Sequence, residues 1–518
     1  MTEPLFLAID HGTSGVRAAL VSGEGAVRGY AVRTTPIHFL PGGGAEQNPE
    51  DWWQALCACV SELAQKDLIP PSGVTALCVS STFSTTVAVD EQGSALAPAM
   101  TWMDGRGGKH VKNALRGFPS VMGYGLLPMM SWIKITGGGP SLSGKDDIGH
   151  VLFWKNEQPE LYQKAAFFLP SKDYLNARLT GKIAASIDSM TLFWISDTRN
   201  ISQVRYDPGL IARLGIAPEK LPPMHPSTHV LGTLCEKAAR DLSLSPDTPV
   251  VCGSPDHQAA GVGSFAVNDF AAHLYIGTSS WVQCVVPYKK TDPLHSIASL
   301  PTAIPGKYYC ANEQDTAGAC VDFFCRTVTP HITENPFAHM DAMAIQSPPG
   351  ANGVIFLPWL NGERTPVDDP NLRAGFINLS KTTLATDMAR AVLEGVATNI
   401  RWSLAFVELF AGRKLTPIHF VGGGSKSALW SQILADVLDR EIVQMEDGHM
   451  ANARGAAFIA AVGTGALSFS DIPALARIQQ RFTPRPENRK EYDRIYDAFL
   501  SFHRKNRGLF ARLNGNGM

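Results

Sequence analysis

The chain has 518 residues, a formal net charge of −2 at pH 7, and 45% hydrophobic against 18% charged residues. This length favours two or three domains, and the composition supplies enough apolar residues for buried cores and excludes a disordered chain. The lack of a basic excess argues against nucleic acid or an anionic membrane as the main partner. The nine cysteines contain no Cys-x-x-Cys pair, which favours reduced, mostly buried thiols over a zinc site.

The beginning of the chain does not read as a targeting segment. Glu3 and Asp10 interrupt the stretch that a signal peptide needs to be apolar. The longest run of small apolar residues, 455–470, is too short to span a bilayer and predicts a tightly packed internal helix. We therefore expect a cytoplasmic protein with no membrane partner.

The first elements predict a three-stranded meander. An apolar run over 5–9 stops at Asp10, and further strands are expected over 16–21 and 26–34, each separated by a Gly-containing turn. The elements expected next are a helix over 49–65 and strands over 74–80 and 85–90.

A second strand–turn–strand unit lies half a chain further on. An apolar run over 271–276 leads into Gly277, Thr278 and Ser279, and a strand over 281–286 follows. The first strand leads in the same way into Gly12, Thr13 and Ser14. This repeat favours two domains of one architecture, each opening with a hairpin of a size that suits a phosphate. Coincidence is the alternative, because Gly-Thr-Ser is a common turn.

Two glycine-rich segments invite a nucleotide interpretation. Between a strand over 417–421 and a helix over 427–438, three consecutive glycines would let the backbone approach a base or ribose. Residues 139–145 fit the front of a P-loop, but Asp146 stands where a hydroxyl is required and Pro140 lacks an N–H group. We interpret 137–147 as a mobile surface insertion.

The C-terminal segment shows an apolar stripe at helical spacing, formed by Tyr492, Ile495, Tyr496, Phe499 and Phe502. Such a stripe predicts the docking face of a last helix.

Three charged residues suit the chemistry of phosphoryl transfer. That reaction needs donors on the phosphates, a carboxylate for hydrated Mg²⁺ and a carboxylate that accepts the proton of the attacking hydroxyl. Asp10 ends a strand beside the first hairpin and suits the metal role, and Arg17 in the same hairpin can stabilise charge on a phosphate. Asp256, just after a strand over 249–252, is the candidate base, although an Asp at a helix start can equally be an N-cap.

Nine segments, taken in order, carry a resemblance to a known family. They are residues 10–17, 46–53, 102–106, 169–175, 253–261, 276–279, 357–366, 390–395 and 422–425. Through their order and spacing, over nearly the whole length, the chain resembles the FGGY family of carbohydrate kinases and is most similar to its xylulose kinase branch. No single segment is diagnostic by itself.

The resemblance implies an α/β fold of the two-domain, actin-like ATPase (ribonuclease H-like) type, with a cleft between duplicated domains. We place an N-terminal, sugar-binding domain at 1–265 and a C-terminal, ATP-binding domain at 266–518. The implied activity is ATP-dependent phosphorylation of a terminal hydroxyl of a small sugar, with ATP and Mg²⁺ as cofactors. Dimers are common in the xylulose kinase branch, so a homodimer is one expected assembly.

Several alternatives remain open for the function. A ketopentose such as D-xylulose is the first expected substrate, and ribulose, another ketose, a tetritol or glycerol are the others. A non-catalytic sugar sensor on the same fold is less favoured, because Asp10, Asp256 and both hairpins are present. An actin-like switch that controls a protein partner would need an appended peptide-binding module.

The resemblance also assigns site residues. Asp256 is implied as the base, and Asp10 and Asp256 as metal ligands. The implied ATP and phosphate contacts are Gly12, Thr13, Ser14, Arg17, Gly277, Thr278, Ser279, Gly422, Gly423, Gly424, Ser425 and Asn452. The implied substrate contacts are Phe83, Asp104, Arg106, Asp256 and His257.

The chain also departs from the pattern of xylulose kinases. Phe83 replaces a His that hydrogen-bonds the sugar, and His257 follows the base where Asn or Gln is usual. Asn378 stands where Gly is expected, and Asn tolerates the same left-handed backbone. The segment 137–147 is atypical as well. These departures concern the identity of the sugar rather than phosphoryl transfer.

Overall fold

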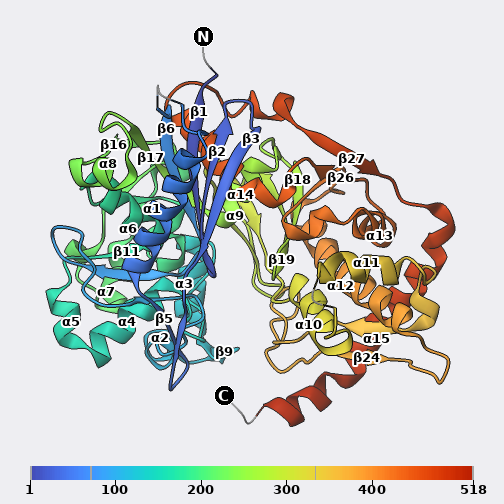
Figure 1. The fold of residues 1–518 in the computed structure, drawn as a ribbon. Helices are drawn as coiled ribbons and strands as arrows, with labels where there is room; N and C mark the ends of the chain where they lie inside the picture. The colour runs from blue at the N-terminus through green and yellow to red at the C-terminus, as the bar shows by residue number, and fades with distance from the viewer. Residues whose placement is uncertain (1–2, 71–72, 333, 516–518) are drawn as a thin grey trace.

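The structure is a computed structural model that describes residues 3–70, 73–332 and 334–515. Two α/β lobes lie side by side, the N-terminal one drawn from blue to green and the C-terminal one mainly from yellow to red (Figure 1). Within these described ranges, no helix combines the length and the apolar character needed to cross a membrane. This architecture is the two-domain, actin-like arrangement predicted from the sequence.

The N-terminal lobe is built on a six-stranded sheet in the order β16–β17–β6–β1–β2–β3. β1, β2 and β3 form the predicted antiparallel meander; β6 pairs with β1 in parallel, and β17 pairs with β6 in parallel. The bounds are β1 Leu5–Gly12, β2 Gly15–Ser22, β3 Val27–Thr34, β6 Ala76–Ser81, β16 Val230–Thr233 and β17 Pro249–Pro255. The carboxyl ends of β1, β6 and β17 therefore meet at one edge of the sheet.

A second, five-stranded sheet of this lobe has the order β11–β7–β8–β5–β4. Its bounds are β4 His38–Leu40, β5 Gly44–Gln47, β7 Thr86–Val89, β8 Ala99–Met100 and β11 Phe167–Pro170. Three short ladders pair β9 Ser120–Val121 with β10 Tyr124–Gly125, β12 Ala185–Ser186 with β15 Met224–His225, and β13 Ser196–Asp197 with β14 Arg205–Tyr206.

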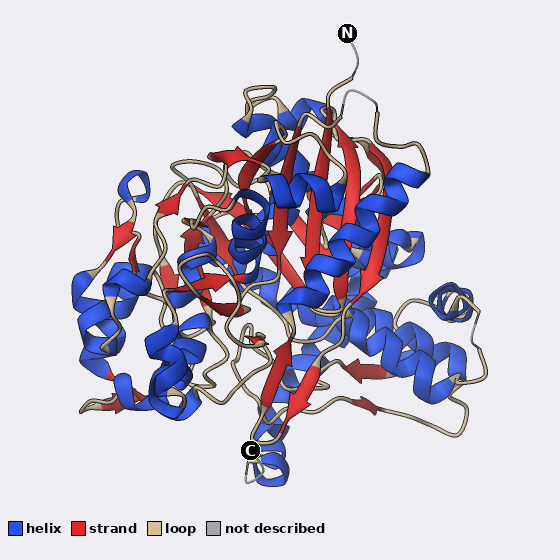
Figure 2. Ribbon diagram, turned by 60° about the vertical axis from the view of Figure 1, so that its left-hand side comes forward, coloured by secondary structure: helices blue, strands red, loops and turns tan. Residues whose placement is uncertain are grey.

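The helices of this lobe cover the sheets, as Figure 2 shows. They are α1 Pro49–Gln65, α2 Gly108–Ala114, α3 Leu126–Thr136, α4 Asp147–Glu157, α5 Pro159–Lys164, α6 Ser171–Thr180, α7 Pro208–Leu214, α8 Glu236–Leu242 and α9 Asp256–Gly263. α1 has the predicted bounds, because Asn48 caps it through Oδ1 (3.1 Å to the Glu50 N–H) and Pro49 suits its first position.

The C-terminal lobe repeats the design with an eight-stranded sheet, β20–β21–β22–β19–β18–β25–β26–β27. β18 and β19 form the predicted second hairpin, and β25 joins β18 in parallel. The bounds are β18 Ala272–Ile276, β19 Ser280–Val286, β20 Thr291–Asp292, β21 Ile297–Pro301, β22 Tyr308–Ala311, β25 Ile418–Val421, β26 Ile442–Met445 and β27 Ile478–Phe482. A short ladder pairs β23 Ile355–Leu357 with β24 Gly375–Ile377.

The helices of the C-terminal lobe are α10 Gly318–Val328, α11 Pro336–Ala344, α12 Ala385–Ala411, α13 Ala428–Leu438, α14 Ala451–Gly463 and α15 Arg489–Asn514. α15 buries Tyr492, Ile495 and Phe499, and the Phe499 ring lies 5.1 Å from that of Trp359. The predicted docking face of the last helix is therefore confirmed.

The two lobes meet at a crossing of α9 and α14. A Cβ added at Gly263 would collide with the carbonyl of Ala451, and one at Gly455 with the carbonyl of Ala259. The helices thus touch through their backbones, and α14 also packs against β1, β6 and β17. The internal helix predicted over 455–470 begins earlier, at Ala451, and ends at Gly463, because the chain turns through Gly465 in the left-handed region (φ 76°).

The interpretation of 137–147 as a surface insertion is wrong. Only Ser143 and Lys145 of this segment are exposed. Thr291 Oγ1 donates to the carbonyl of Gly137 (2.6 Å), and the Ser141 N–H donates to Asp146 Oδ2 (2.6 Å). The segment packs against the C-terminal lobe, and sequence patterning could not show this because the contacts come from residues far along the chain.

Candidate active site

Asp256 lies where β17 ends and α9 begins, at the junction of the lobes. Pro255 occupies the N-cap position, so Asp256 is the first residue of the helix and not its cap. Its Oδ1 accepts the backbone N–H of His257 (2.9 Å). The carboxyl group is thereby oriented locally while its second oxygen stays free of any bond among the described residues.

A bulge in β17 sets the position of Asp256. The register shifts between Val251 and Ser254, and Gly253 adopts a φ of 77° where a Cβ would collide with the carbonyl of Val79. Buried side chains hold the bulge: the carbonyl of Cys252 accepts Lys172 Nζ (3.0 Å) and Asn176 Nδ2 (2.7 Å).

The next residue of the bulge is fixed as well. Ser254 Oγ donates to Asp188 Oδ2, which also accepts the Ser227 hydroxyl (2.8 Å). Because these partners are buried, the strand end cannot shift without breaking several hydrogen bonds. These hydrogen bonds therefore hold the backbone rigidly just before Asp256, two residues further on.

Asp10 and Arg17 face each other across the first hairpin. They are register partners in β1 and β2, and Arg17 Nη1 lies 3.1 Å from Asp10 Oδ2. Arg17 Nη1 also lies 3.4 Å from the carbonyl of His449, so it reaches the C-terminal lobe. Burial raises the pKa of the Asp10 carboxyl, whereas the charge of Arg17 and a hydrogen bond from Asn452 lower it.

Asp10 and Asp256 lie close enough to influence each other. Burial raises the pKa of Asp256 well above its ordinary value, and the negative charges of Asp10 and Glu313 raise it further. Asp10 is buried and Asp256 is half-buried, and two neighbouring carboxyl groups of this kind need a cation beside them to stay ionised together. Their oxygens are the donor type that Mg²⁺ prefers, so this pair fits a magnesium ion.

Any such ion would take few ligands from the protein. Across the described ranges, no group of three or more His, Cys, Asp or Glu side chains could hold a metal. Mg²⁺ commonly keeps several waters and binds one or two carboxylates together with substrate phosphates. The arrangement around Asp10 therefore suits a metal that arrives with a nucleotide.

The second hairpin and the glycine turn lie next to each other. Tyr275 of β18 pairs with Val421 of β25, so the chain leaves both strands at the same edge, into 277–279 and 422–425. Ser425 Oγ donates to the carbonyl of Gly422 (2.8 Å), which closes the turn, and no atom lies within 4 Å of a Cβ built at Gly423. This open backbone fits a flat ligand such as an adenosine.

An aromatic stack lines the other side of Asp256. The imidazole of His257 stacks on Trp281 (ring centroids 3.8 Å apart), and Trp281 stacks on Tyr275 (4.1 Å). Phe83 meets His257 edge-on at 5.7 Å. Burial lowers the pKa of His257 to about 3, so its ring is neutral at pH 7, and Gln283 Nε2 lies 2.9 Å from its Nδ1.

Asp104 and Arg106 form a cluster of their own. Asp104 is buried and accepts the Ala45 N–H (2.9 Å) and the Arg106 guanidinium (2.6 Å for Nη2). Arg106 also pairs with Glu46 (2.5 Å) and lies over the ring of Phe153 (4.5 Å). The structure thus places these two predicted substrate contacts in an internal ion-pair network, with no contact to Asp256.

Sequence reasoning missed three candidates. Trp102 is partly exposed (39%) and donates through Nε1 to Thr13 Oγ1 (2.9 Å), beside the first hairpin. Trp281 lies in the second hairpin, shortly after its Gly-Thr-Ser turn, and an aromatic residue at that place was a visible signal. Glu313 pairs with Arg364 (2.5 Å) and influences Asp256, but no local pattern marks it.

Known proteins resemble this chain over nearly its whole length. Two family models match, described as the N-terminal domain (residues 5–135 and 148–263) and the C-terminal domain (272–464) of the FGGY family of carbohydrate kinases. The xylulose kinase of Staphylococcus epidermidis is 27% identical, over 99% of both chains. The gluconokinase of Bacillus subtilis is 26% identical, over 96% of this chain and 95% of that one.

A solved structure, the xylulose kinase from Rhodospirillum rubrum, superposes with a TM-score of 0.82 at 27% identity, over 97% of this chain and 99% of that one. The family models together span most of the chain, and members of the family are sugar kinases that use ATP as phosphate donor. The chain therefore belongs to the FGGY family of carbohydrate kinases and is a sugar kinase.

Proposed function

We propose that this kinase transfers the γ-phosphoryl group of ATP to a terminal hydroxyl of a ketopentose, with D-xylulose as the first candidate. The observation that carries the proposal is the half-buried Asp256 beside Asp10, at the junction of the lobes and between the two hairpins. The resemblance to xylulose kinases supports the acceptor class, and the similarity to a gluconokinase keeps other small sugars and polyols as alternatives.

Asp256 is the proposed general base. As the sugar hydroxyl attacks, its proton passes to the free carboxylate oxygen of Asp256, because a sugar hydroxyl does not ionise at neutral pH. Arg17 stabilises negative charge that develops on the transferred group. Mg²⁺ held by Asp10, with Asp256 nearby, would neutralise the phosphates when bound with ATP.

Both hairpins and the glycine turn are the proposed nucleotide contacts. Gly12, Thr13, Ser14, Gly277, Thr278 and Ser279 would donate to phosphates, and Gly422, Gly423, Gly424 and Ser425 would contact the adenosine, with Asn452 nearby. We propose that sugar binds mainly to residues 1–265 and ATP mainly to 266–518. The backbone contact of α9 with α14 supports this division, because it lies between the two sheets.

Phe83 and His257 are the proposed substrate contacts beside Asp256. Their edge-on packing supports a wall of the site in which Phe83 supplies an apolar surface and His257 supplies an imidazole. To bind a sugar, Asp104 and Arg106 would have to break the hydrogen bonds between them and form new ones to the sugar hydroxyls. We also propose a cytoplasmic location, no nucleic-acid partner and a homodimer, the last to be tested by analytical ultracentrifugation.

A panel assay tests the proposed function. ADP release is measured with the full chain, ATP, Mg²⁺ and each of D-xylulose, D-ribulose, gluconate, erythritol and glycerol. We expect sugar-dependent ADP release, fastest with a ketopentose. Binding of a sugar without ADP release would indicate a sensor. A rate of ADP release that none of the sugars changes would indicate a nucleotide switch.

Substitution of Phe83 by His tests the substrate contact. A hydrogen bond to a sugar hydroxyl is worth about 1–3 kcal/mol when its partner is deleted. We expect Phe83→His to raise kcat/KM for D-xylulose by about tenfold, since the ring lies next to His257. A wild type that already prefers D-xylulose, together with a slower Phe83→His variant, would contradict this assignment.

A further inference from the structure

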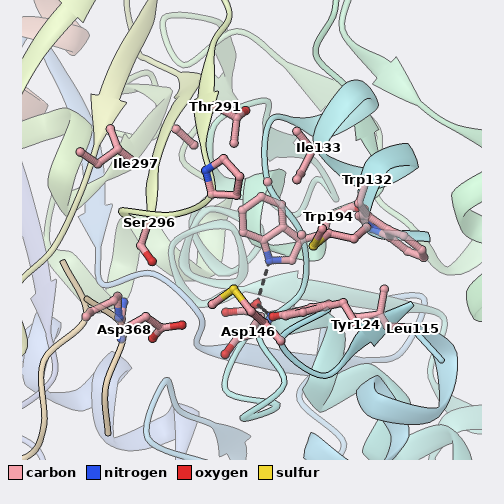
Figure 3. Close-up of a pocket in the computed structure, with 18 of the residues that line it drawn as sticks. Leu115, Tyr124, Trp132, Ile133, Asp146, Trp194, Thr291, Ser296, Ile297 and Asp368 are labelled. Atoms are coloured by element: carbon pink, nitrogen blue, oxygen red, sulfur yellow. Dashed lines mark hydrogen bonds between the residues drawn. The ribbon is translucent and has the colours of Figure 1, made fainter. Parts of the chain in front are cut away.

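A cavity of about 340 Å³ lies between the lobes, and none of the residues assigned to the reaction lines it. One wall comes from α3, the segment 136–147 and Trp194, and the other from the β20–β21 turn and residues 364–368 (Figure 3). The N-terminal family model leaves out residues 136–147, so this segment of the wall is not part of the family pattern, whereas most of α3 and Trp194 lie within the matched ranges. Ligand sites commonly have this volume and lie between domains.

A fixed indole ring dominates the first wall. Trp194 Nε1 donates to Asp146 Oδ2 (2.8 Å), and the carbonyl of Trp194 accepts Trp132 Nε1 (2.8 Å). Figure 3 shows the Trp194 ring directed into the pocket lining, with Asp146 below it. A tryptophan fixed at its ring nitrogen and at its backbone carbonyl presents a flat apolar face at low entropic cost.

The charged side chains of the lining differ in how far they are already paired within the protein. Arg364 is already paired with Glu313 (2.5 Å) and lies 3.5 Å from Asp315, so its charge is largely compensated. Asp146 and Asp368 remain as hydrogen-bond acceptors, and Lys145 is an exposed cation of the lining besides Arg364, which is itself exposed. This balance disfavours a phosphate or carboxylate ligand and favours a neutral molecule that donates hydroxyl groups.

We propose that this cavity is a second ligand site, which binds a neutral sugar or polyol. The C–H face of the ligand packs on the indole of Trp194, and its hydroxyls donate to Asp146 and Asp368. Neither Asp10 nor Asp256 lines the cavity, whereas Arg364 links it to Glu313 beside the active site. Because the ligand touches both lobes, its binding favours the arrangement in which the two walls have this spacing.

The test fills the cavity from its second wall. Ser296 lines the cavity, and Leu294 lies exposed (73%) on the same turn and does not line it. Ser296→Phe and the matched control Leu294→Phe are compared with the wild-type chain by calorimetry, without ATP. The probes are xylitol, D-xylose, D-glucose and glycerol, with inorganic phosphate as the anionic comparison.

We expect at least one neutral probe to bind the wild type, at least about tenfold weaker binding by Ser296→Phe, and a change of less than about twofold in Leu294→Phe. If Ser296→Phe lowers the melting temperature, Ser143→Trp blocks the same cavity from the exposed side of the first wall. KM for the acceptor sugar is expected to stay within about twofold in either blocked variant.

Three results would overturn the proposal. The first is that no neutral probe binds the wild type at about 10 mM, or that blocked variants bind as the wild type does. The second is that, of all the probes, only inorganic phosphate binds more weakly to the blocked variants than to the wild type. The third is that loss of probe binding is matched by an equal rise in KM for the acceptor, which would assign the cavity to the acceptor site itself. Because binding is measured without turnover, the outcome is separate from that of the ADP-release assay.

Discussion

The two hairpins have the same backbone design and opposite chemistry. In each, a strand runs into Gly-Thr-Ser and returns antiparallel, and its first strand has a parallel neighbour. Two residues before the glycine, the first hairpin has Asp10, which pairs across the strands with Arg17 (3.1 Å). At the same place, the second hairpin has Tyr275, which stacks on Trp281 (4.1 Å).

The repeat therefore preserves the Gly-Thr-Ser turn, and the two copies differ in the cross-strand pair beneath it, a charged pair in one and an aromatic pair in the other. The ion pair lies beside Asp256 and can act on charge that develops during transfer. The aromatic pair packs against His257, one of the proposed substrate contacts. Substitutions in the two pairs should therefore separate effects on kcat from effects on KM.

The largest effect of this comparison is expected from the charged pair. Arg17→Gln removes the cation beside Asp10 and should lower kcat by about 10²–10³-fold, since loss of one preorganised donor to a developing charge has this size. Arg17→Lys keeps the charge and should restore part of the rate. Steady-state kinetics with saturating ATP measures both.

Arg28→Gln is the matched control, because Arg28 lies on β3 of the same meander in an exposed ion pair with Glu3 (2.7 Å). Exposed pairs contribute little, so turnover should stay within about twofold. Equal losses in Arg17→Gln and Arg28→Gln would mean that the charge of the hairpin has no special role.

A smaller effect is expected from the aromatic pair. Trp281→Leu removes the ring on which His257 stacks, and should raise KM for the sugar by about tenfold while kcat changes by less than about threefold. Trp281→Phe keeps an aromatic face and should stay close to the wild type. A loss confined to kcat, at unchanged KM and melting temperature, would contradict the division of roles.

The smallest effect is a shift in pH dependence. The base works only when Asp256 is ionised, so kcat/KM falls as pH decreases through the pKa of Asp256. The charge of Glu313 raises that pKa, and Glu313→Gln should therefore move the acid limb of the profile to lower pH. Glu441→Gln, in a partly exposed pair with Arg481, is the control that should leave the limb in place.

Local patterns predicted the scaffold well. The meander, α1, the second hairpin and α15 follow from alternation, caps and apolar stripes that lie within single segments. The resemblance supplied the two-lobe fold, which the structure and the family match confirm. What periodicity could not give is the bulge at Gly253, because it depends on Lys172, Asn176 and Asp188 from distant segments.

The site was predicted only where a motif marks it. Asp10, Arg17, Asp256 and Asn452 come together as the sequence suggested. Glu313 was missed because it reaches the site through tertiary packing, and the segment 137–147 was misplaced because its partners, such as Thr291, lie in the other lobe. The ion-pair network of Asp104 and Arg106 could not be predicted either, because Glu46 and the Ala45 N–H that complete it lie in a distant segment, and their role as substrate contacts stays a prediction.

The central claim is that Asp256 accepts the proton of the sugar hydroxyl, and the most direct test is the turnover of Asp256→Asn. Asn keeps the size and one hydrogen-bonding oxygen but cannot accept the proton. The account predicts a kcat lowered by at least about 10²-fold, with sugar affinity by calorimetry within about threefold and an unchanged melting temperature. Near-normal turnover of Asp256→Asn would contradict the base assignment and the mechanism built on it.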